Sequence, residues 1–231
     1  MRIWLSLLLL LLIFTTGRAI GASEENESRR LLLDKKIDAL QQQSQTPEVI
    51  KALDSFTLAK NQLEKTVEFH RQTRQYRELV TNFSEQTEDL AAQITAFSST
   101  EFPDFTDWKQ DELTLEIAEQ DNRLEQLEQT RSNNKNDLQA IEQGIDEFSY
   151  LSEQLRGKVK KTENLLKHEQ QQTDNDDALL ILEIAHQYYV SQLYTLEAKQ
   201  LSAGNRRTLA KQRIQLSNLE IEARQAYRNN L

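Results

Sequence analysis

The chain has 231 residues, of which 28% are charged and 7% are aromatic. This composition favours long solvated helices over the compact aromatic core of a globular enzyme. The formal net charge is −9, and without a basic stripe such a chain is a poor binder of nucleic acid and of anionic lipid headgroups. Cysteine is absent, which excludes disulfide bonds, thiol catalysis and thiolate metal sites.

Residues 1–22 have the pattern of an export signal. Arg2 supplies a short positive start, and the stretch from Ile3 to Phe14 is apolar. The small residues at the expected cleavage site are Ala19, Gly21 and Ala22. An uncleaved anchor is the alternative, but about 12 apolar residues are fewer than the roughly 20 that span a bilayer as a helix. We therefore expect cleavage, which leaves residues 23–231 as one exported helical domain without a membrane span. An uncleaved chain would stay tethered to the inner membrane.

The first helix is expected from about Glu24 to Gln43. Its apolar side consists of Leu32, Leu33, Ile37 and Leu40. The tripeptide Thr46-Pro47-Glu48 then predicts a new helix. It combines an N-cap hydroxyl, a proline at the first helical position and an acid near the positive end of the helix dipole.

This second helix meets no helix-breaking residue until Ser98-Ser99, which predicts a rod of about 75 Å. Its apolar stripe consists of Val49, Leu53, Phe56, Leu63, Val67, Phe69, Tyr76, Val80, Phe83, Leu90, Ile94 and Phe97. The spacing is three or four residues in each half, but the register slips by one residue between Val67 and Phe69. Such a slip predicts a local change of supercoil or of packing partner.

The segment 98–106 is the clearest loop, because Pro103 and its polar neighbours stop a helix. The chain should reverse there and return as an antiparallel third helix. Trp108 is expected to pack near this turn rather than to stack on a ligand.

The third helix has the most regular heptad pattern. Its apolar seam consists of Ile117, Leu124, Leu127, Leu138, Ile141, Ile145, Phe148, Leu155, Val159 and Leu166. The polar residues on the same seam are Gln120, Arg131, Asn134, Ser152 and Thr162. Polar seam positions lower stability but fix register, so they indicate packing rather than a binding site. The residues expected to be buried against the second or fourth helix are Leu138, Ile141, Ile145 and Phe148. Gln139 is expected to face solvent.

A polar turn is expected at 170–177, where an Asp or Asn can cap the fourth helix. Its acidic cluster lacks the central glycine of a calcium-binding loop, so a calcium site is not expected.

Two more helices are expected after this turn. The apolar side of the fourth helix carries Leu179, Leu182, His186, Tyr189, Leu193 and Leu196. The apolar side of the fifth carries Leu209, Leu216, Leu219, Ala223 and Ala226. Gly204-Asn205 divides them. Glycine at a helix end commonly takes the left-handed conformation, so we expect a bend or a reversal there.

The sequence offers no candidate catalytic, cofactor-binding or metal-ligating residue. The histidines His70, His168 and His186 fall on three predicted helices without paired spacing, so a zinc site is not expected. His186 lies on an apolar seam and is expected to be packed or hydrogen-bonded, with a pH-sensitive contact as the alternative. No phosphate-binding glycine loop and no nucleophile elbow is present. We therefore expect a protein that is not an enzyme and needs no cofactor.

Residues 192–213, QLYTLEAKQLSAGNRRTLAKQR, resemble the end of the N-terminal "porin" domain of large mechanosensitive channels of the small-conductance (MscS) superfamily. More weakly, DKKIDALQQQ and KALDSFTLAKNQLEK resemble the opening of that domain. Leu201-Ser202, Arg206 and Leu209 are similar to the Leu-Ser-x-x-x-Arg-x-x-Leu run of the miniconductance branch. That branch usually carries proline where this chain has Gly204-Asn205.

Periodicity predicts an all-α fold of long antiparallel, coiled-coil-like helical hairpins. The resemblance implies a periplasmic, non-catalytic domain that is regulatory or scaffolding. Because membrane helices and a pore domain are missing from the sequence, we expect a truncated channel or fragment that does not itself conduct ions. Its expected partners are proteins bound through helical faces, such as channel membrane domains or a second copy of the chain. The alternative is a free periplasmic coiled-coil adaptor of the cell envelope.

Overall fold

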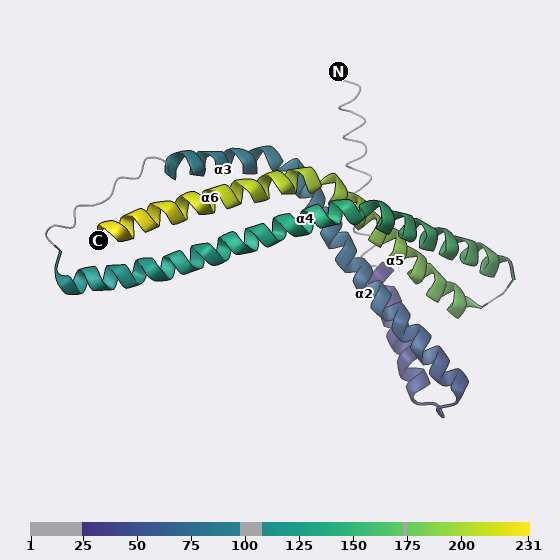
Figure 1. The fold of residues 1–231 in the computed structure, drawn as a ribbon. Helices are drawn as coiled ribbons and strands as arrows, with labels where there is room; N and C mark the ends of the chain where they lie inside the picture. The colour runs from purple at the N-terminus through teal and green to yellow at the C-terminus, as the bar shows by residue number, and fades with distance from the viewer. Residues whose placement is uncertain (1–24, 98–107, 173–174) are drawn as a thin grey trace, which may run out of the picture. The chain divides into compact units, whose positions relative to one another are not determined.

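The computed structural model describes residues 25–97, 108–172 and 175–231, and the regular structure within these ranges is α-helical. The first helical stretch covers residues 25–41. It is followed by α2 (Pro47–Thr81), α3 (Phe83–Phe97), α4 (Gln110–Gln172), α5 (Asp176–Leu201) and α6 (Ala203–Asn230) (Figure 1). The predicted all-α fold is confirmed.

Capping side chains define the starts of two helices. The Thr46 hydroxyl accepts a hydrogen bond from the backbone N–H of Val49 at 3.4 Å, and Pro47 is the first residue of α2. The Asn175 side-chain oxygen accepts a hydrogen bond from the N–H of Ala178 at 3.3 Å, at the start of α5. These contacts satisfy N–H groups that have no partner within the helix. Both predicted N-caps are therefore confirmed.

Two of the predicted segments lie outside the described residues. They are the export signal at 1–22 and the loop at 98–106. Trp108, the first described residue after that loop, is 36% exposed.

The chain divides into two compact units. Unit 1 contains the described residues up to Arg71 together with Gln154–Leu193. Unit 2 contains Gln72–Glu153 and Tyr194–Leu231. The helices α2, α4 and α5 contribute residues to both units, because each division falls inside a helix.

The apolar core of unit 1 lies between the helical stretch 25–41, α2 and α5. Its buried side chains are Leu33, Phe56, Ala59, Leu63 and Ile184. Ile37, Leu40, Leu180 and Ile181 pack against them. Leu32, which was predicted on the same side as Leu33, is exposed instead. Burial of one Leu or Ile side chain stabilises a fold by about 1.5–3 kcal/mol, so this cluster is a major apolar anchor of unit 1.

In unit 1, α2 and α5 run parallel to each other. Lys36 lies over the Phe56 ring at 5.7 Å and also pairs with Asp177, so these residues of α2 and α5 lie at one level. Further along both helices, the ring of Phe69 lies 5.7 Å from the ring of Tyr188. Two helices that are separated by two reversals of the chain point in the same direction. The predicted antiparallel order of consecutive helices is therefore consistent with a parallel α2 and α5. α4 and α5 run antiparallel, since Thr162 lies beside His186 and Lys158 lies beside Tyr189.

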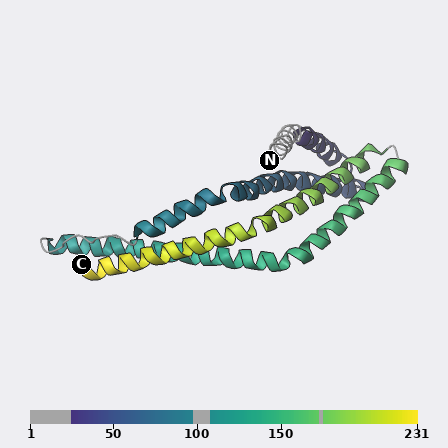
Figure 2. The same ribbon diagram turned by 90° about the horizontal axis from the view of Figure 1, so that it is seen from above.

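In unit 2, α3 lies along α6 (Figures 1 and 2). α4 runs antiparallel to α6, because Glu142 pairs with Arg207 near the start of α6 and Asp121 pairs with Arg228 near its end. One buried apolar cluster of this unit consists of Ile141, Ala203 and Ala210, with Leu138 and Ile145 packed against them.

The helix breaks at Asn82 and Ser202 are local interruptions. The N–H of Asn82 bonds to the Glu78 carbonyl at 2.9 Å, so the helical hydrogen bonds continue from α2 into α3. Ser202 likewise donates to Ala198 at 3.0 Å and has φ −83° and ψ −7°. Gly204 lies inside α6 without a positive φ. The left-handed conformation expected at Gly204 is therefore wrong. Of the two alternatives left open there, a bend or a reversal, the reversal is excluded, because the helical hydrogen bonds continue through this position.

The predicted stripe of the second helix is wrong at two positions. Val67 is 52% and Val80 38% exposed, whereas Thr66 is 1% exposed and Leu79 is half-buried. Ala59 and Thr66 continue the buried face of α2, so the predicted register slip near Val67 does not occur. Counting only large apolar side chains misses alanine and threonine, which pack at seams between helices.

The predicted seam of the third helix is confirmed. All fifteen predicted apolar and polar seam residues on α4 are buried or half-buried, and Gln139 is exposed. The predicted partner is incomplete, because Ile141 packs against Ala203 and Ala210 of α6. Ile141 and Ile145 also line a hollow with Leu196 and Lys199 of α5, the predicted fourth helix. A heptad pattern indicates which face of a helix is covered but does not identify the helix that covers it.

Candidate functional site

The segment Leu201–Arg213 joins α5 to α6 in unit 2, and we call it the junction segment. It carries the second part of the family resemblance, which covers residues 192–213. Its buried side chains are Ser202, Ala203, Leu209 and Ala210. Three of the four are small, which lets α6 approach α4 closely. Leu201, at the start of the segment, is 73% exposed.

Two arginines connect the junction segment to other helices of unit 2. The guanidinium carbon of Arg206 lies 5.2 Å from the centre of the Tyr76 ring on α2. Such a cation–π contact is worth about 0.5–1 kcal/mol at an exposed site. Arg207 Nε lies 3.0 Å from Glu142 Oε1 on α4, and both side chains remain about half exposed. A pair of this kind contributes at most about 1 kcal/mol.

A narrow hollow lies between α4 and the end of α5. It is lined by Ile141, Gly144, Ile145, Leu196, Lys199, Gln200, Ala203 and Arg206. It has room for about one water molecule. A Cβ added at Gly144 would lie 3.7 Å from Lys199 Nζ, an ordinary contact. The junction is therefore built for packing between helices rather than for holding a small molecule.

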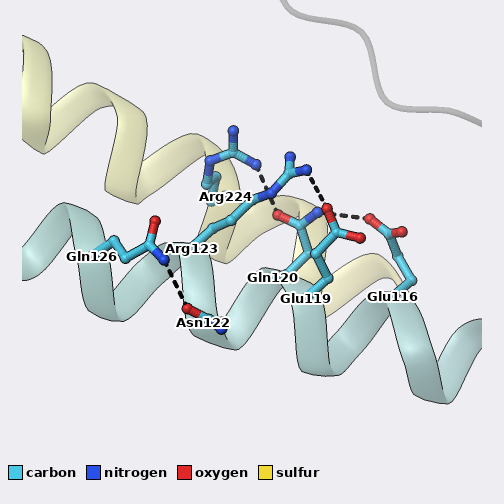
Figure 3. Close-up of polar contacts among 7 residues, drawn as sticks. All are labelled: Glu116, Glu119, Gln120, Asn122, Arg123, Gln126 and Arg224. Carbon is cyan, nitrogen blue, oxygen red and sulfur yellow. Dashed lines mark hydrogen bonds and ion pairs between the residues drawn. The ribbon is translucent and has the colours of Figure 1, made fainter.

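A group of polar side chains joins the end of α6 to the start of α4, and we call it the end cluster. It consists of Glu116, Gln120 and Asp121 of α4 with Arg224, Tyr227 and Arg228 of α6. Arg224 donates to Gln120 Oε1 at 2.9 Å, and Gln120 donates through Nε2 to Glu116 at 2.6 Å (Figure 3). Arg228 donates to both carboxylate oxygens of Asp121. The geometry is that of a specific clamp between two antiparallel helices.

Burial changes the titration of two side chains on α6. Burial raises the pKa of the Tyr227 hydroxyl, and a hydrogen bond to Glu116 raises it further. Tyr227 is therefore neutral at physiological pH and donates to Glu116. Burial also raises the pKa of the Glu220 carboxyl, while the charge of Arg224 acts in the opposite direction.

The three histidines are not brought together. His186 Nδ1 lies 3.0 Å from the Thr162 hydroxyl of α4, which confirms the prediction of a hydrogen-bonded seam residue. His70 Nε2 on α2 lies 2.9 Å from the Ser191 hydroxyl of α5. His168 lies on an exposed face of α4. Within the described ranges, no three or more His, Asp and Glu side chains are placed to hold a metal ion.

Sequence reasoning identified only part of these contacts. It included Arg206 in the family resemblance but assigned Tyr76 to an apolar stripe, so it missed their stacking. It also missed the end cluster. The sequence feature that corresponds to this cluster is the acidic start of α4 together with the arginines at the end of α6. This feature can be interpreted only once these two helices are known to pack against each other.

Comparison with known proteins identifies the family. A family model described as "Mechanosensitive ion channel porin domain" matches residues 36–231. The match covers most of the chain, and the chain belongs to this family. No curated protein and no solved structure matches it. Over the described part of the chain, no helix combines the length and the apolar character needed to cross a membrane.

Proposed function

We propose that this member of the porin domain family is a non-catalytic, periplasmic regulatory or scaffolding domain. It acts on a protein partner through packing contacts between helices. The observation that carries the proposal is the family match over residues 36–231. A domain of channel proteins is expected to act on channel components, so the proposed partner is the membrane part of a mechanosensitive channel.

The proposed mechanism is mechanical. α4 has 63 residues, which corresponds to about 95 Å of helix. The hydrogen bonds that continue across Asn82 and Ser202 allow neighbouring helices to move together rather than as separate pieces. Such a domain can bias channel gating only if it makes different contacts in the closed and open states of its partner.

The periplasmic location is part of this proposal. It is supported by the pattern of Arg2, the apolar stretch 3–14 and the small residues before Ser23. A reporter enzyme that is active only outside the cytoplasm, fused after Leu231, tests the location. Activity is expected with the natural start and should be lost when residues 3–14 are made polar. Equal activity of both fusions would contradict export by this segment.

We further propose that the chain is closest to the miniconductance branch. The support comes from the run Leu201-Ser202, Arg206 and Leu209. In unit 2 these residues have packing roles, since Ser202 and Leu209 are buried and Arg206 lies over Tyr76. A membrane partner from that branch is therefore the first to test.

The decisive experiment measures channel activity with and without this chain. The chain is expressed in one strain without mechanosensitive channels and in another that retains one miniconductance-type channel. We expect no tension-gated current in the first strain and a shifted gating tension in patches from the second. Survival of hypo-osmotic shock should change only in the second strain. The control is Ile141→Asp, which should disrupt packing in unit 2 and abolish the shift.

Two results would contradict the proposal. Tension-gated current in the channel-free strain would show that the chain itself conducts ions. An unchanged gating tension, together with cross-linking to envelope proteins other than channels, would favour the free adaptor.

A further inference from the structure

One face of α4 in unit 1 is strongly basic. Residues 156–168 contain five Lys or Arg residues and one acid, in a chain whose net charge is −9. The expectation that the chain has no basic stripe is therefore wrong. Within this stretch, Lys160, Lys161, Leu165 and His168 share the exposed side of the helix, opposite its buried seam, and we call them the basic face.

The basic face is available for contact. Its residues, with Gly157 and Asn164, line an open hollow on the surface of α4. Among the described residues, neither Lys160 nor Lys161 makes an ion pair, whereas nearby Lys167 pairs with Glu163 at 2.6 Å. Leu165 lines the same hollow as Lys160 and Lys161 and is 44% exposed. A Cβ added at Gly157 would have no neighbour within 4 Å, so an approaching helix meets no obstruction there.

A face of complementary charge lies near the start of the same helix, in unit 2. It consists of Asp111, Glu112, Leu115 and Glu119, all exposed, and we call it the acidic face. Leu115 is 73% exposed. Glu112 accepts a hydrogen bond from the backbone N–H of Lys109, and Glu119 pairs with Arg123 in its own helix. The bond to Lys109 leaves the negative charge of Glu112 at the surface, whereas Arg123 partly offsets the charge of Glu119.

The two faces match in charge and in spacing. Each begins with two adjacent charged residues, continues with an exposed leucine four or five positions later, and ends with a third ionisable residue at the ninth position. Helical residues spaced in this way share one side, so each face presents an exposed leucine beside charged side chains. Opposite charges beside an apolar contact favour one binding partner and one relative orientation of the two helices.

We propose that the basic face binds the acidic face of a second copy of this chain. The faces lie near opposite ends of α4, so their pairing requires a second copy. The contact joins two different surfaces of the chain, one from each copy. Two helical turns per partner bury less area than the roughly 1,200 Å² of a stable interface, so the association is weak and depends on ionic strength. This inference goes beyond the proposed function and does not depend on it.

Sedimentation velocity of the full chain tests this contact. We expect concentration-dependent association at about 0.05 M salt that weakens at about 0.5 M salt. Lys160→Glu/Lys161→Glu should weaken association at least about tenfold. Asp111→Lys/Glu119→Lys should do the same. A mixture of the two variants should associate again, because the unaltered acidic face of the first can bind the unaltered basic face of the second. The two reversed faces are complementary as well.

The matched control is Arg74→Glu/Lys211→Glu, which makes the same charge change at exposed residues outside both faces. It should associate as the unaltered chain does. Circular dichroism of each variant must show unchanged helix content, and Lys160→Gln/Lys161→Gln provides a milder variant. A chain that stays monomeric at every concentration would overturn the proposal. So would failure of the mixed variants to associate, or binding of Lys160 and Lys161 to anionic phospholipid vesicles by a monomeric chain.

Discussion

The guanidinium of Arg224 donates a hydrogen bond to the side-chain oxygen of Gln120 at 2.9 Å, although the two residues are 104 positions apart. Gln120 is only 3% exposed. Its polar side chain is accommodated in the seam because Arg224 and Glu116 use both ends of its amide group. This contact determines how the end of α6 is positioned on α4.

A double-mutant cycle at this pair should reveal a coupling of about 1 kcal/mol between Gln120→Ala and Arg224→Ala. The reason is that each single change removes the same hydrogen bond and leaves the other side chain without this contact. Urea unfolding of the four chains gives the coupling. The control is the exposed bond of Gln126 to Asn122 within α4 (Figure 3), which should couple by under about 0.5 kcal/mol. Equal couplings would contradict a clamp between helices.

Ile141→Asp should destabilise the chain by several kcal/mol, because Ile141 is 5% exposed and a buried carboxylate would lack a partner. Gln139→Asp introduces the same group at an exposed position of α4 and should change stability by under about 0.5 kcal/mol. Thermal and urea unfolding measure both. Similar melting temperatures for the two variants would show that Ile141 is not buried against Ala203 and Ala210.

Gly204→Ala should leave stability unchanged or raise it by up to about 1 kcal/mol. Gly204 lies in α6 without a positive φ, and an added Cβ would have no neighbour within 4 Å. Thermal unfolding compares this variant with Gly144→Ala, where the added Cβ makes an ordinary contact at 3.7 Å. A clear loss of stability at Gly204 alone would instead indicate a left-handed residue and a chain reversal.

Glu220→Gln should stabilise the chain at about pH 7 more than at about pH 4. Burial raises the pKa of Glu220 in the folded chain, so the folded chain holds this proton more tightly than the unfolded chain does. Its contribution to stability is greatest below the unfolded pKa and declines as the pH rises through the folded pKa. Melting temperatures against pH test this, with the exposed Glu222→Gln as control. An equal effect of both variants at each pH would exclude burial as the cause.

Local sequence patterns were sufficient for much of the fold. The Thr46 and Asn175 caps start their helices where predicted, because a capping side chain acts on N–H groups two or three residues away. The seam of α4 was also predictable along its length, including buried Gln120 and Thr162. A spacing of three and four residues is a property of one helix and needs no knowledge of its neighbours.

Only the tertiary structure decided which faces meet. The apolar stripe of one helix can pack against the stripe of many other helices. The sequence therefore did not indicate that Ile141 packs on Ala203 and Ala210. It also did not indicate that Arg224 reaches Gln120. Burial of Thr66 beside exposed Val67 has the same origin, because the direction from which the neighbouring helices approach selects the covered side. The sequence thus determined helix content and the α4 seam, while partner choice depended on non-local packing, for which residue spacing carries no signal.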